Sequence, residues 1–415
     1  MIKVLKKTAF RLMLLCCIVE AGCIITESPA VIENPASFSQ LGEVNEGLQP
    51  VFVQIQEEQS ALAKEANTEP EPEPEPEPLH ITLVAVGDNL LHMPIVSWCR
   101  TADGYDFTPL YKEVEKLIAA SDFAFVNQES PLGGSAFAPS GYPMFNSPQQ
   151  AGLALAATGF NIVNQANNHG LDKGAKAVKA TADFWQEETD TLCLGINRSQ
   201  EERDTIRIIE KQGYRFAWLA YSYGTNGMPM AQNYLMNLID KQAMAKDVQK
   251  AQELADTVIV SLHWGNEYQF EPSVEQRELA QYLADLGVAL IIGHHPHVIQ
   301  PLEWLMGKEG HRTLVMFSLG NFISNQDRRD RMLEGMLSLE FIEEKSGLVI
   351  DKCGVIPLVM HYERGYINYC VYPLDAYSDD LAKRHYINQL DKPVSLEFFV
   401  ELAKKIWGEF CLLHS

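Results

Sequence analysis

The chain has 415 residues, and 33 lysines and arginines against 55 aspartates and glutamates give it a formal net charge of −22. With 46% hydrophobic residues it is too apolar to be wholly disordered, and its acidity disfavours a general nucleic-acid binder. Its apolar runs fall short of the roughly 20 residues that span a bilayer, which argues against a polytopic membrane protein. Residues 1–78 carry −8, from 5 basic residues and 13 glutamates, which leaves −14 for residues 79–415.

Residues 1–23 have the pattern of an export signal or a membrane anchor. Four basic residues precede the apolar stretch Leu12 to Val19, and Cys23 follows two small residues. This cysteine resembles that of a bacterial lipobox, where it is lipidated, but Glu20 stands where the motif has an aliphatic residue. Ordinary cleavage, lipidation at Cys23 and an uncleaved anchor stay open. All three predict an extracytoplasmic protein, secreted or held at the bacterial cell surface, with membrane contact only through this segment.

Residues 24–78 are expected to form a disordered linker. Residues 24–68 lack strong periodicity, and five Glu-Pro dipeptides then occupy Glu69 to Pro78. Proline fixes φ and removes a backbone donor while the glutamates repel one another, which predicts an extended spacer of about 3 Å per residue. A stalk that lifts a domain off a membrane and a mere solvated linker both fit this composition.

From residue 79 onward, short β-type runs alternate with helical stretches. Strands are predicted at 80–86, 123–126, 161–163, 216–220, 257–262, 288–292 and 313–317. Helices are predicted at about 172–187, 240–254 and 274–286, followed by antiparallel strands within 334–373 and helical sequence at 377–407. This alternation predicts an α/β layered fold with buried strands. Residues 79–330 are assigned to a domain core, and 331–415 to strands and helices that complete the same domain.

Cysteine usage limits how this domain is held together. Of the eight cysteines, five lie beyond residue 78, and none shows Cys-x-x-Cys spacing. A dense disulfide framework or a cysteine-based zinc site is therefore not expected, although one or two bridges stay open in an exported protein.

Polar side chains follow six of the predicted strands, where ligand sites of open α/β sheets lie. The candidates near these strand ends are Asp88, His92, Asn127, Glu129, Asn168, His169, His263, Glu267, His295, His297 and Asn321. A lone aspartate or histidine there is more often a helix cap or a satisfied polar group, and Asp88 alone fits a cap. The convergence of so many in one alternating region predicts a metal site or a polar active-site cleft.

His295-Pro296-His297 is the sharpest part of this pattern. In an extended segment, residues two apart point to the same side, and proline stiffens the segment, so both imidazoles are predicted to face one cavity. Imidazole, carboxylate and amide groups suit divalent ions such as Mn, Fe, Zn or Mg. Two ions about 3.5–4 Å apart, bridged by a carboxylate, would clamp a phosphate-like group.

Taken in order, these motifs resemble those of the CapA family, which is associated with poly-γ-glutamate capsule synthesis. The matching strings are Val86-Gly87-Asp88, Val126 to Glu129, Ala166 to Gly174, Tyr221 to Gly227, His263 to Glu267, Gly293 to Gln300 and Ser318 to Phe322. The resemblance covers about 80 to 325, with Gln128 in place of the family's usual leucine.

The family is similar to calcineurin-like metallophosphatases, which implies a four-layer α/β/β/α sandwich with its site at the strand ends. The metal ligands that the resemblance implies are Asp88, His92, Glu129, Asn168, His263, His295 and His297. It also implies His169 as a proton donor and Glu267 as an acid/base or as the support of a ligand histidine. Asn127, Asn226 and Asn321 are expected to contact substrate. Since Glu129 stands in place of a bridging aspartate, one-metal and two-metal sites both stay open.

Two functions are compatible with these observations. The first is a metal-dependent, phosphoesterase-like hydrolase that acts on an anionic polymer or on a phosphorylated cell-envelope substrate. The second is a non-catalytic accessory or polymer-binding factor of capsule assembly that works with capsule-synthesis membrane proteins. A body with a charge of −14 repels an anionic polymer, so contact has to be local, through bound cations or through basic stretches such as Arg328, Arg329 and Arg331. Nucleic acid is not an expected partner.

Overall fold

The computed structural model describes residues 79–345 and 347–413. The predicted signal at 1–23, the lipidation candidate Cys23 and the linker at 24–78 lie outside the described residues. Within the described part of the chain, no helix is both long enough and apolar enough to cross a membrane. The five cysteines in this part, Cys99, Cys193, Cys353, Cys370 and Cys411, are free thiols.

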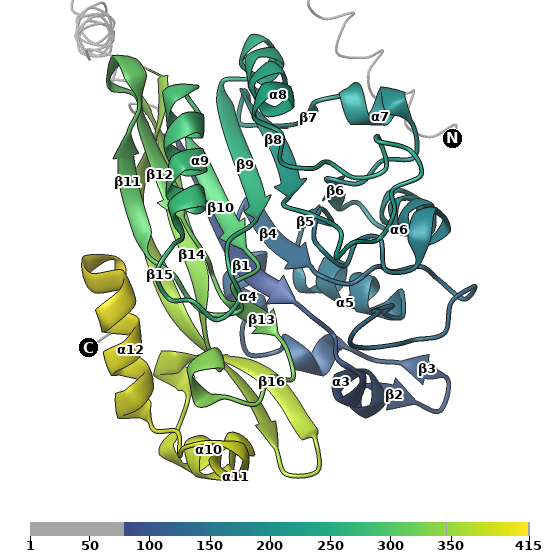
Figure 1. Cartoon of the computed structure of the whole chain (residues 1–415). Coiled ribbons are helices and arrows are strands. Elements are labelled where there is room, and N and C mark those ends of the chain that lie inside the picture. Colours follow the sequence, from purple (N-terminus) through teal and green to yellow (C-terminus); the bar gives the residue numbers. More distant parts are fainter. Residues whose placement is uncertain (1–78, 346, 414–415) are drawn as a thin grey trace, which may run out of the picture. The chain divides into compact units, whose positions relative to one another are not determined.

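Two mixed β-sheets build the framework (Figure 1). The eight-stranded sheet consists in spatial order of β16 (Ile367–Pro373), β15 (Gly347–Glu363), β14 (Leu333–Glu344), β1 (His80–Asn89), β4 (Phe123–Gln128), β5 (Ile162–Asn164) and β6 (Leu192–Leu194), with β13 (Asn321–Ile323) also paired to β1. The six-stranded sheet consists of β11 (Leu302–Met306), β12 (Arg312–Met316), β10 (Leu290–His294), β9 (Thr257–His263), β8 (Tyr214–Ser222) and β7 (Arg207–Lys211). A small hairpin pairs β2 (Arg100–Thr101) with β3 (Gly104–Tyr105).

Helices cover the outer faces of these sheets (Figure 1). The α-helices are α3 (Met93–Trp98), α4 (Glu115–Ala119), α5 (Gln150–Thr158), α6 (Gly174–Glu188), α7 (Gln200–Asp204), α8 (Lys241–Leu254), α9 (Val274–Asp285), α10 (Asp379–Arg384), α11 (Ile387–Leu390) and α12 (Leu396–Trp407). On the six-stranded sheet, Met244 and Val248 of α8 and Leu283 of α9 belong to one buried apolar cluster with the strands. Leu155 of α5 and Trp185 of α6 belong to the larger cluster that involves the other sheet.

An aromatic core joins the two sheets. Phe123 and Phe125 of β4 meet Phe216 and Trp218 of β8, with ring centroids 4.8 to 6.1 Å apart. Because successive side chains of a strand point to opposite faces, β8 also places Leu219 on the face that α8 and α9 cover. Both faces of the six-stranded sheet are therefore buried. This accounts for the continuous apolar runs of its strands and confirms the predicted α/β fold.

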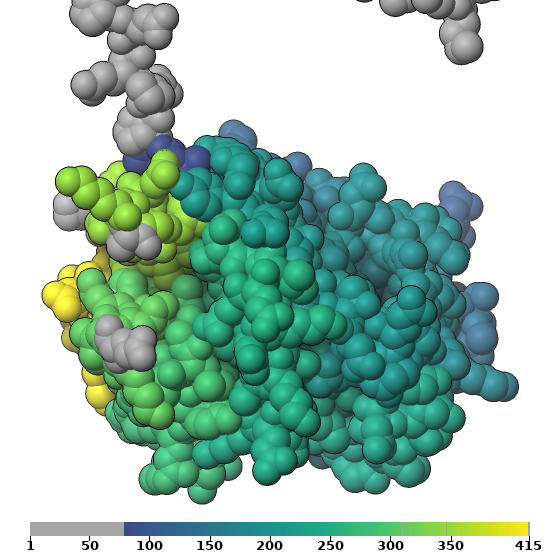
Figure 2. Space-filling view, turned by 90° about the horizontal axis from the view of Figure 1, so that it is seen from above, coloured from purple at the N-terminus to yellow at the C-terminus, as the bar shows by residue number. Residues whose placement is uncertain are grey.

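The parallel central strands bring their carboxyl ends to one edge of the framework. In β1 and β4, Asp88 pairs with Asn127, and in β9 and β10, His263 pairs with His294. On the other side of β1, Asn321 of β13 also pairs with Asp88. Figure 2 views the opposite end, where β1 starts beside β14 of the light-green β14–β15 hairpin. The polar strand ends and the start of the described chain thus lie at opposite ends of β1.

Gly87 permits the close approach that places Asp88. The register of β1 against β4 shifts between Val86 and Asp88, and the amide of Asp88 donates to the Gly320 carbonyl at 3.0 Å. A Cβ built on Gly87 would lie 2.0 Å from that same oxygen. Such a bulge re-aims a side chain at the end of a strand, here the carboxylate of Asp88.

We expect Gly87→Ala to destabilise the fold by about 1–3 kcal/mol or more, because the backbone of β1 or β13 has to move away. Gly224→Ala is the matched control, since its Cβ would meet nothing within 4 Å and its φ is not positive. Urea unfolding of both variants measures the difference. Equal stabilities would show that Gly87 can be replaced without cost.

Candidate functional site

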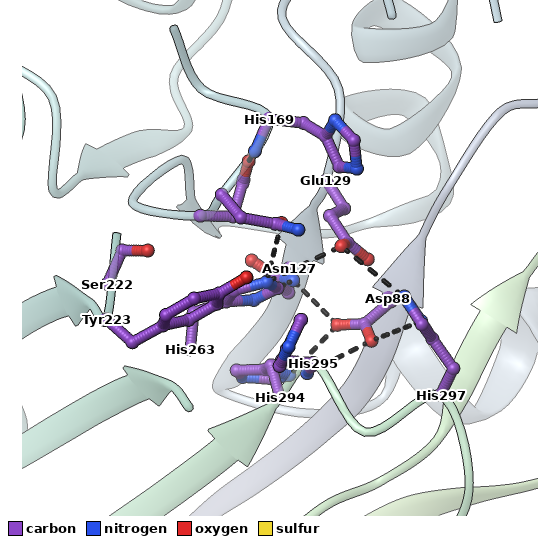
Figure 3. A network of polar contacts seen from close by, with 12 residues as sticks. Asp88, Asn127, Glu129, His169, Ser222, Tyr223, His263, His294, His295 and His297 are labelled. Atoms are coloured by element: carbon purple, nitrogen blue, oxygen red, sulfur yellow. Dashed lines mark hydrogen bonds and ion pairs between the residues drawn. The ribbon is translucent and has the colours of Figure 1, made fainter. Parts of the chain in front are cut away.

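Asp88 lies at the centre of a buried polar network (Figure 3). Its Oδ1 accepts a hydrogen bond from Asn127 Nδ2 at 2.7 Å, and its Oδ2 accepts one from the His295 amide at 3.2 Å. His297 Nδ1 lies 3.2 Å from Oδ2, and His294 Nδ1 lies 3.7 Å from Oδ1. The carboxylate therefore connects strands of both sheets with the loop that follows β10.

Glu129 directly follows β4 and is fully buried, yet neither carboxylate oxygen has a hydrogen-bond partner among the residues that the structure describes. Its Oε1 lies 3.4 Å from His263 Nε2 and 3.7 Å from His297 Nε2. Burial of a carboxylate without donors is costly, because nothing replaces its lost hydration. A cation held between this carboxylate and the imidazoles would remove the cost.

The loop after β10 does not have the backbone that the sequence suggested. His295 and His297 have φ angles of +98° and +56°, so the prediction of an extended His-Pro-His unit is wrong. Left-handed backbone is uncommon for residues other than glycine, and it clusters at functional sites. Both rings still face one space, with centroids 5.8 Å apart. The two left-handed residues thus bring both imidazoles to one space, as the extended geometry was expected to do.

Glu129, His295 and His297 together have the chemistry of a metal centre. Each offers one ligand atom, these atoms all lie within 4.8 Å of one another, and all three residues are buried. His295 Nδ1, like the Glu129 oxygens, lacks a hydrogen-bond partner within the described chain. Carboxylate oxygen and imidazole nitrogen suit Mn, Fe and Zn. The residues present therefore fit a divalent cation.

His263 and Asn168 border this cluster and contact each other. His263 Nε2 lies 2.9 Å from Asn168 Oδ1, and both side chains are buried. Asn127 lies in the network as well, where its Oδ1 accepts a hydrogen bond from Asn164 Nδ2 at 2.8 Å. Its amide group thus orients Asp88 from below the cluster, and its predicted contact with substrate stays a prediction.

His169 forms a buried pair with Asp172. His169 Nδ1 lies 2.8 Å from Asp172 Oδ2, which also accepts a hydrogen bond from the amide of Phe145 at 2.6 Å. The Phe145 ring packs edge-on against His169 at 4.6 Å. His169 is close enough to Glu129 for its charge to act on the pKa of that carboxyl (Figure 3). The pair therefore fixes an imidazole whose Nε2 is left to face the cluster.

Asn321 holds His297 in place. Its Nδ2 donates to the His297 carbonyl at 3.1 Å, and its Oδ1 lies 3.0 Å from His297 Nδ1. Both ends of the amide thus contact His297 and help to fix the shape of the cluster, and the predicted contact of Asn321 with substrate stays a prediction.

The other predicted site residues lie at the margin. His92 Nδ1 lies 3.2 Å from the Leu90 carbonyl and 3.3 Å from the amide nitrogen of Asn325. Glu267 and Asn226 are exposed, in the loops after β9 and β8. The predicted roles of these three residues stay predictions.

Sequence reasoning missed two residues of the network. Asp172 follows His169 by three positions in a turn, and that spacing was the available signal. His294 was given no role, yet it is buried, stacks on Phe125 at 5.5 Å and has no hydrogen-bond partner in the described residues for either ring nitrogen. Its neighbour His295 drew attention through the His-Pro-His spacing, which His294 does not share.

Burial and neighbouring charges shift the pKa values of the network in opposite directions. Burial opposes ionisation of Asp88, but the hydrogen bond and charge of His297 outweigh it and hold the pKa of Asp88 well below its usual range. Burial raises the pKa of Glu129 to about 8, although His297 opposes this and Asp88 adds to it. Burial also disfavours protonation of His297, yet Glu129 and Asp88 raise its pKa to about 9. At neutral pH, Glu129 and His297 thus hold protons that a bound cation would displace.

The family described as "Bacterial capsule synthesis protein PGA_cap" matches residues 82–326, which is more than half of the chain. The chain belongs to the PGA_cap family. All residues of the network described above lie within the matched segment.

Two relatives carry the name CapA. The "PGA biosynthesis protein CapA" of Bacillus subtilis is 26% identical over 307 residues, which cover 71% of this chain and 74% of that protein. The "Capsule biosynthesis protein CapA" of Bacillus anthracis is 29% identical over 258 residues, which cover 59% of this chain and 60% of that protein. This PGA_cap protein therefore spans less than two thirds of the second relative.

Among solved structures, a calcineurin-like phosphoesterase of Bacillus subtilis, YfkN, has a TM-score of 0.40 and 12% identity to this chain. The match covers 68% of this chain and 90% of that one. A likeness at this level does not extend to activity.

The pKa shifts predict how the stability of the metal-free PGA_cap protein depends on pH. Folding raises the pKa of Glu129 from 4.5 to about 8 and that of His297 from 6.5 to about 9, so the folded state holds extra protons. The contribution of Glu129 to stability is lost as the pH rises from about 4.5 to about 8, and that of His297 as it rises from about 6.5 to about 9. Burial lowers the pKa values of His263 and His294 from 6.5 to about 3, so their contribution to stability is lost as the pH falls through that range.

We therefore expect the free energy of unfolding of the chelator-treated protein to peak near pH 6.5, measured in urea across a pH series. Saturating divalent cation should flatten the alkaline decline, because it replaces the protons on Glu129 and His297. A metal-free stability that keeps rising between about pH 7 and pH 9 would contradict these pKa directions.

Proposed function

We propose that this CapA-like protein is a metal-dependent hydrolase of the phosphoesterase type that acts in capsule biosynthesis. The observation that carries the proposal is the buried cluster of Glu129, His295 and His297, whose ligand atoms all lie within 4.8 Å of one another. The Glu129 oxygens and His295 Nδ1 have no hydrogen-bond partner within the described chain. Two mixed sheets with helices outside them agree with a four-layer α/β/β/α sandwich of the metallophosphatase type, which the sequence motifs imply. The site at the carboxyl ends of parallel strands is where such a fold would place it.

Glu129, His295 and His297 would hold one divalent cation, with identity among Mn, Fe, Zn and Mg. Asp88, His263 and Asn168 are the candidates for completing the shell or for holding a second ion. When bound, such a cation would polarise a phosphoryl or carbonyl oxygen of the substrate. The remaining chemistry belongs to the side chains around it.

His169 is the group best placed to move a proton. Asp172 engages its Nδ1 and fixes the orientation of the ring, so Nε2 would hand a proton to the leaving oxygen. Glu267, exposed in the loop after β9, is a second acid/base candidate at the entrance. Asn127 and Asn321 keep Asp88 and His297 oriented during this transfer.

The sequence and the family support a proposal for the substrate class and the setting. The names of the two relatives, which refer to PGA and to capsule biosynthesis, favour an anionic capsular polymer as substrate. A phosphoesterase-type site also suits a phosphorylated cell-envelope compound, and capsule-synthesis membrane proteins are the proposed partners. The export pattern of residues 1–23 favours an extracytoplasmic position, with Cys23 as the candidate lipid anchor.

A second candidate is a protein that binds a cation and the polymer without turnover. One observation favours it: both Asp88 oxygens already accept hydrogen bonds, from Asn127 and from the His295 amide. These hydrogen bonds leave fewer lone pairs of Asp88 for a second ion. The arrangement is thus closer to a one-cation site than to a two-cation clamp.

We expect Glu129→Gln to weaken binding of Mn²⁺ or Zn²⁺ by more than about 100-fold. Loss of a residue that only supports a ligand costs about 10–100-fold in affinity, and this substitution removes the charge of a ligand itself. The fold should survive, since the amide avoids the cost of a buried carboxylate. Calorimetric titration of the chelator-treated chain measures the affinity. His311→Asn is the control, because His311 precedes β12 at the end of the sheet away from the cluster. Equal affinities in both variants would exclude Glu129 as a ligand.

His169→Asn should lower kcat by about 10²–10⁴-fold on an alkyl phosphoester, whose poor leaving group needs a proton, and by less on an aryl phosphoester. Metal content should stay unchanged. Turnover of both substrates by the metal-loaded chain, with and without chelator, is the measurement. Bound metal without turnover of either ester would exclude the phosphoesterase and favour the second candidate, and absence of both metal binding and turnover would exclude the metal-dependent site.

A further inference from the structure

We propose that Arg331 and Tyr268 form a subsite for a carboxylate of an anionic polymer, next to the cluster of Glu129, His295 and His297. This inference rests on the proposed function, because it concerns the substrate of the same site. The loop after β9 provides Tyr268, and the short 3-10 helix η5 (Arg329–Arg331) provides Arg331.

Tyr268 is fixed to the loop that carries the cluster histidines. Its amide donates to the Pro296 carbonyl at 2.7 Å, and its ring centroid lies 6.1 Å from that of His297. Its φ angle is +63°, a conformation that a tyrosine adopts only when its surroundings impose it. The side chain nevertheless stays 37% exposed. Tyr268 is therefore a rigid, accessible aromatic platform beside the cluster.

Arg331 packs over this platform and keeps 19% of its side chain exposed. Its Cζ is 3.6 Å from the Tyr268 ring centroid, a cation–π contact that holds the guanidinium beside the ring. Nη1 donates to Gln326 Oε1 at 3.0 Å and lies 3.3 Å from Asp327 Oδ1. For Nε and Nη2 the described residues provide no partner. This free edge is the planar pair of N–H donors that binds a carboxylate through both oxygens.

Asp327 does not block the subsite. Its side chain is 74% exposed, and within the described chain its ion pair is with Nη1 of Arg331. An exposed pair of this kind contributes little, because water competes for both partners. A second carboxylate can therefore bind at the opposite edge of the guanidinium without breaking the pair.

A second aromatic ring packs beside the cluster. Tyr223, in the loop after β8, is 47% exposed, and its ring centroid lies 4.6 Å from that of His295. Two tyrosines, from the loops after β8 and β9, thus contact the two cluster histidines from the outside. A polymer unit held at the cluster would extend over these rings.

Because the body is acidic, recognition of an anionic polymer depends on a positively charged side chain close to the cluster. Residues 79–415 carry −14, so long-range attraction cannot bring an anionic chain to the site, and salt screens charges beyond about 8–10 Å. A polymer with a carboxylate on every unit needs a directional contact near the cluster. Arg331 supplies it, whereas Arg328 lies 3.5 Å from Asp391 and Arg329 stacks on Phe398 at 3.9 Å.

Arg328 and Arg331 therefore form a matched pair for the test. The full chain, loaded with Mn²⁺, is titrated with a short poly-γ-glutamate oligomer, and with the same oligomer after amidation of its carboxylates. Arg331→Gln should weaken binding of the acidic oligomer by about tenfold or more, because charge-assisted hydrogen bonds are lost. Arg328→Gln removes the same charge and should change the affinity by less than about twofold. The amidated oligomer should bind weakly to all three proteins.

Metal content and thermal unfolding of Arg331→Gln should match those of the unaltered chain. If this variant does not fold, Arg331→Lys takes its place in the test, since it keeps the charge but loses the planar fork and should bind the acidic oligomer several-fold more weakly.

Equal losses in Arg331→Gln and Arg328→Gln would overturn the subsite, as would equal binding of the amidated oligomer. A metal-loaded chain that hydrolyses phosphoesters but binds no oligomer would also overturn it, while leaving the proposed function intact. Arg331-dependent binding by a chain that turns over nothing would support the subsite and exclude the hydrolase.

Discussion

A buried carboxylate without donors is the constraint on which the rest of the site depends. Glu129 is enclosed by imidazoles and is removed from water, and within the described chain nothing donates to it. The protein keeps this costly group where Asp88 already engages His297 and the His295 amide. Two acids and several histidines held together without water are stable only with protons or a cation among them. A site of this kind can take up a cation in exchange for protons, and the fold has to keep its shape in both states.

The site can keep its shape in both states because rigid strands carry the residues of the cluster and of its surroundings. Parallel strands of both sheets end there, so Asp88 and His263 are set by backbone ladders rather than by mobile loops. Amide side chains do the fine positioning: Asn127 holds Asp88, and Asn321 holds His297. Amides keep the same donors and acceptors over the whole pH range of the histidines, so the geometry does not depend on which groups are charged.

The sequence predicts the site residues whose positions are set by the ends of strands. It does not predict those whose positions are set by the packing of loops. Strand-end positions identified Asp88, Glu129 and His263, because a parallel sheet brings its carboxyl ends together whatever the loops do. The backbone of His295 was mispredicted, since its left-handed conformation is imposed by packing and has no signal in residue type. The platform under Arg331 could not be predicted, because loops more than sixty residues apart build it.

The direction of β1 has a mechanical consequence. Its ten residues run from His80, at the end where the chain enters the described unit, to the site edge, a length of about 30 Å. A pull on the chain before residue 80 would act along this strand. It would load the hydrogen bonds to β4 and β14 in shear, so many would have to break together before the strand moved. Asp88, near the far end of the same strand, would keep its place under such a load.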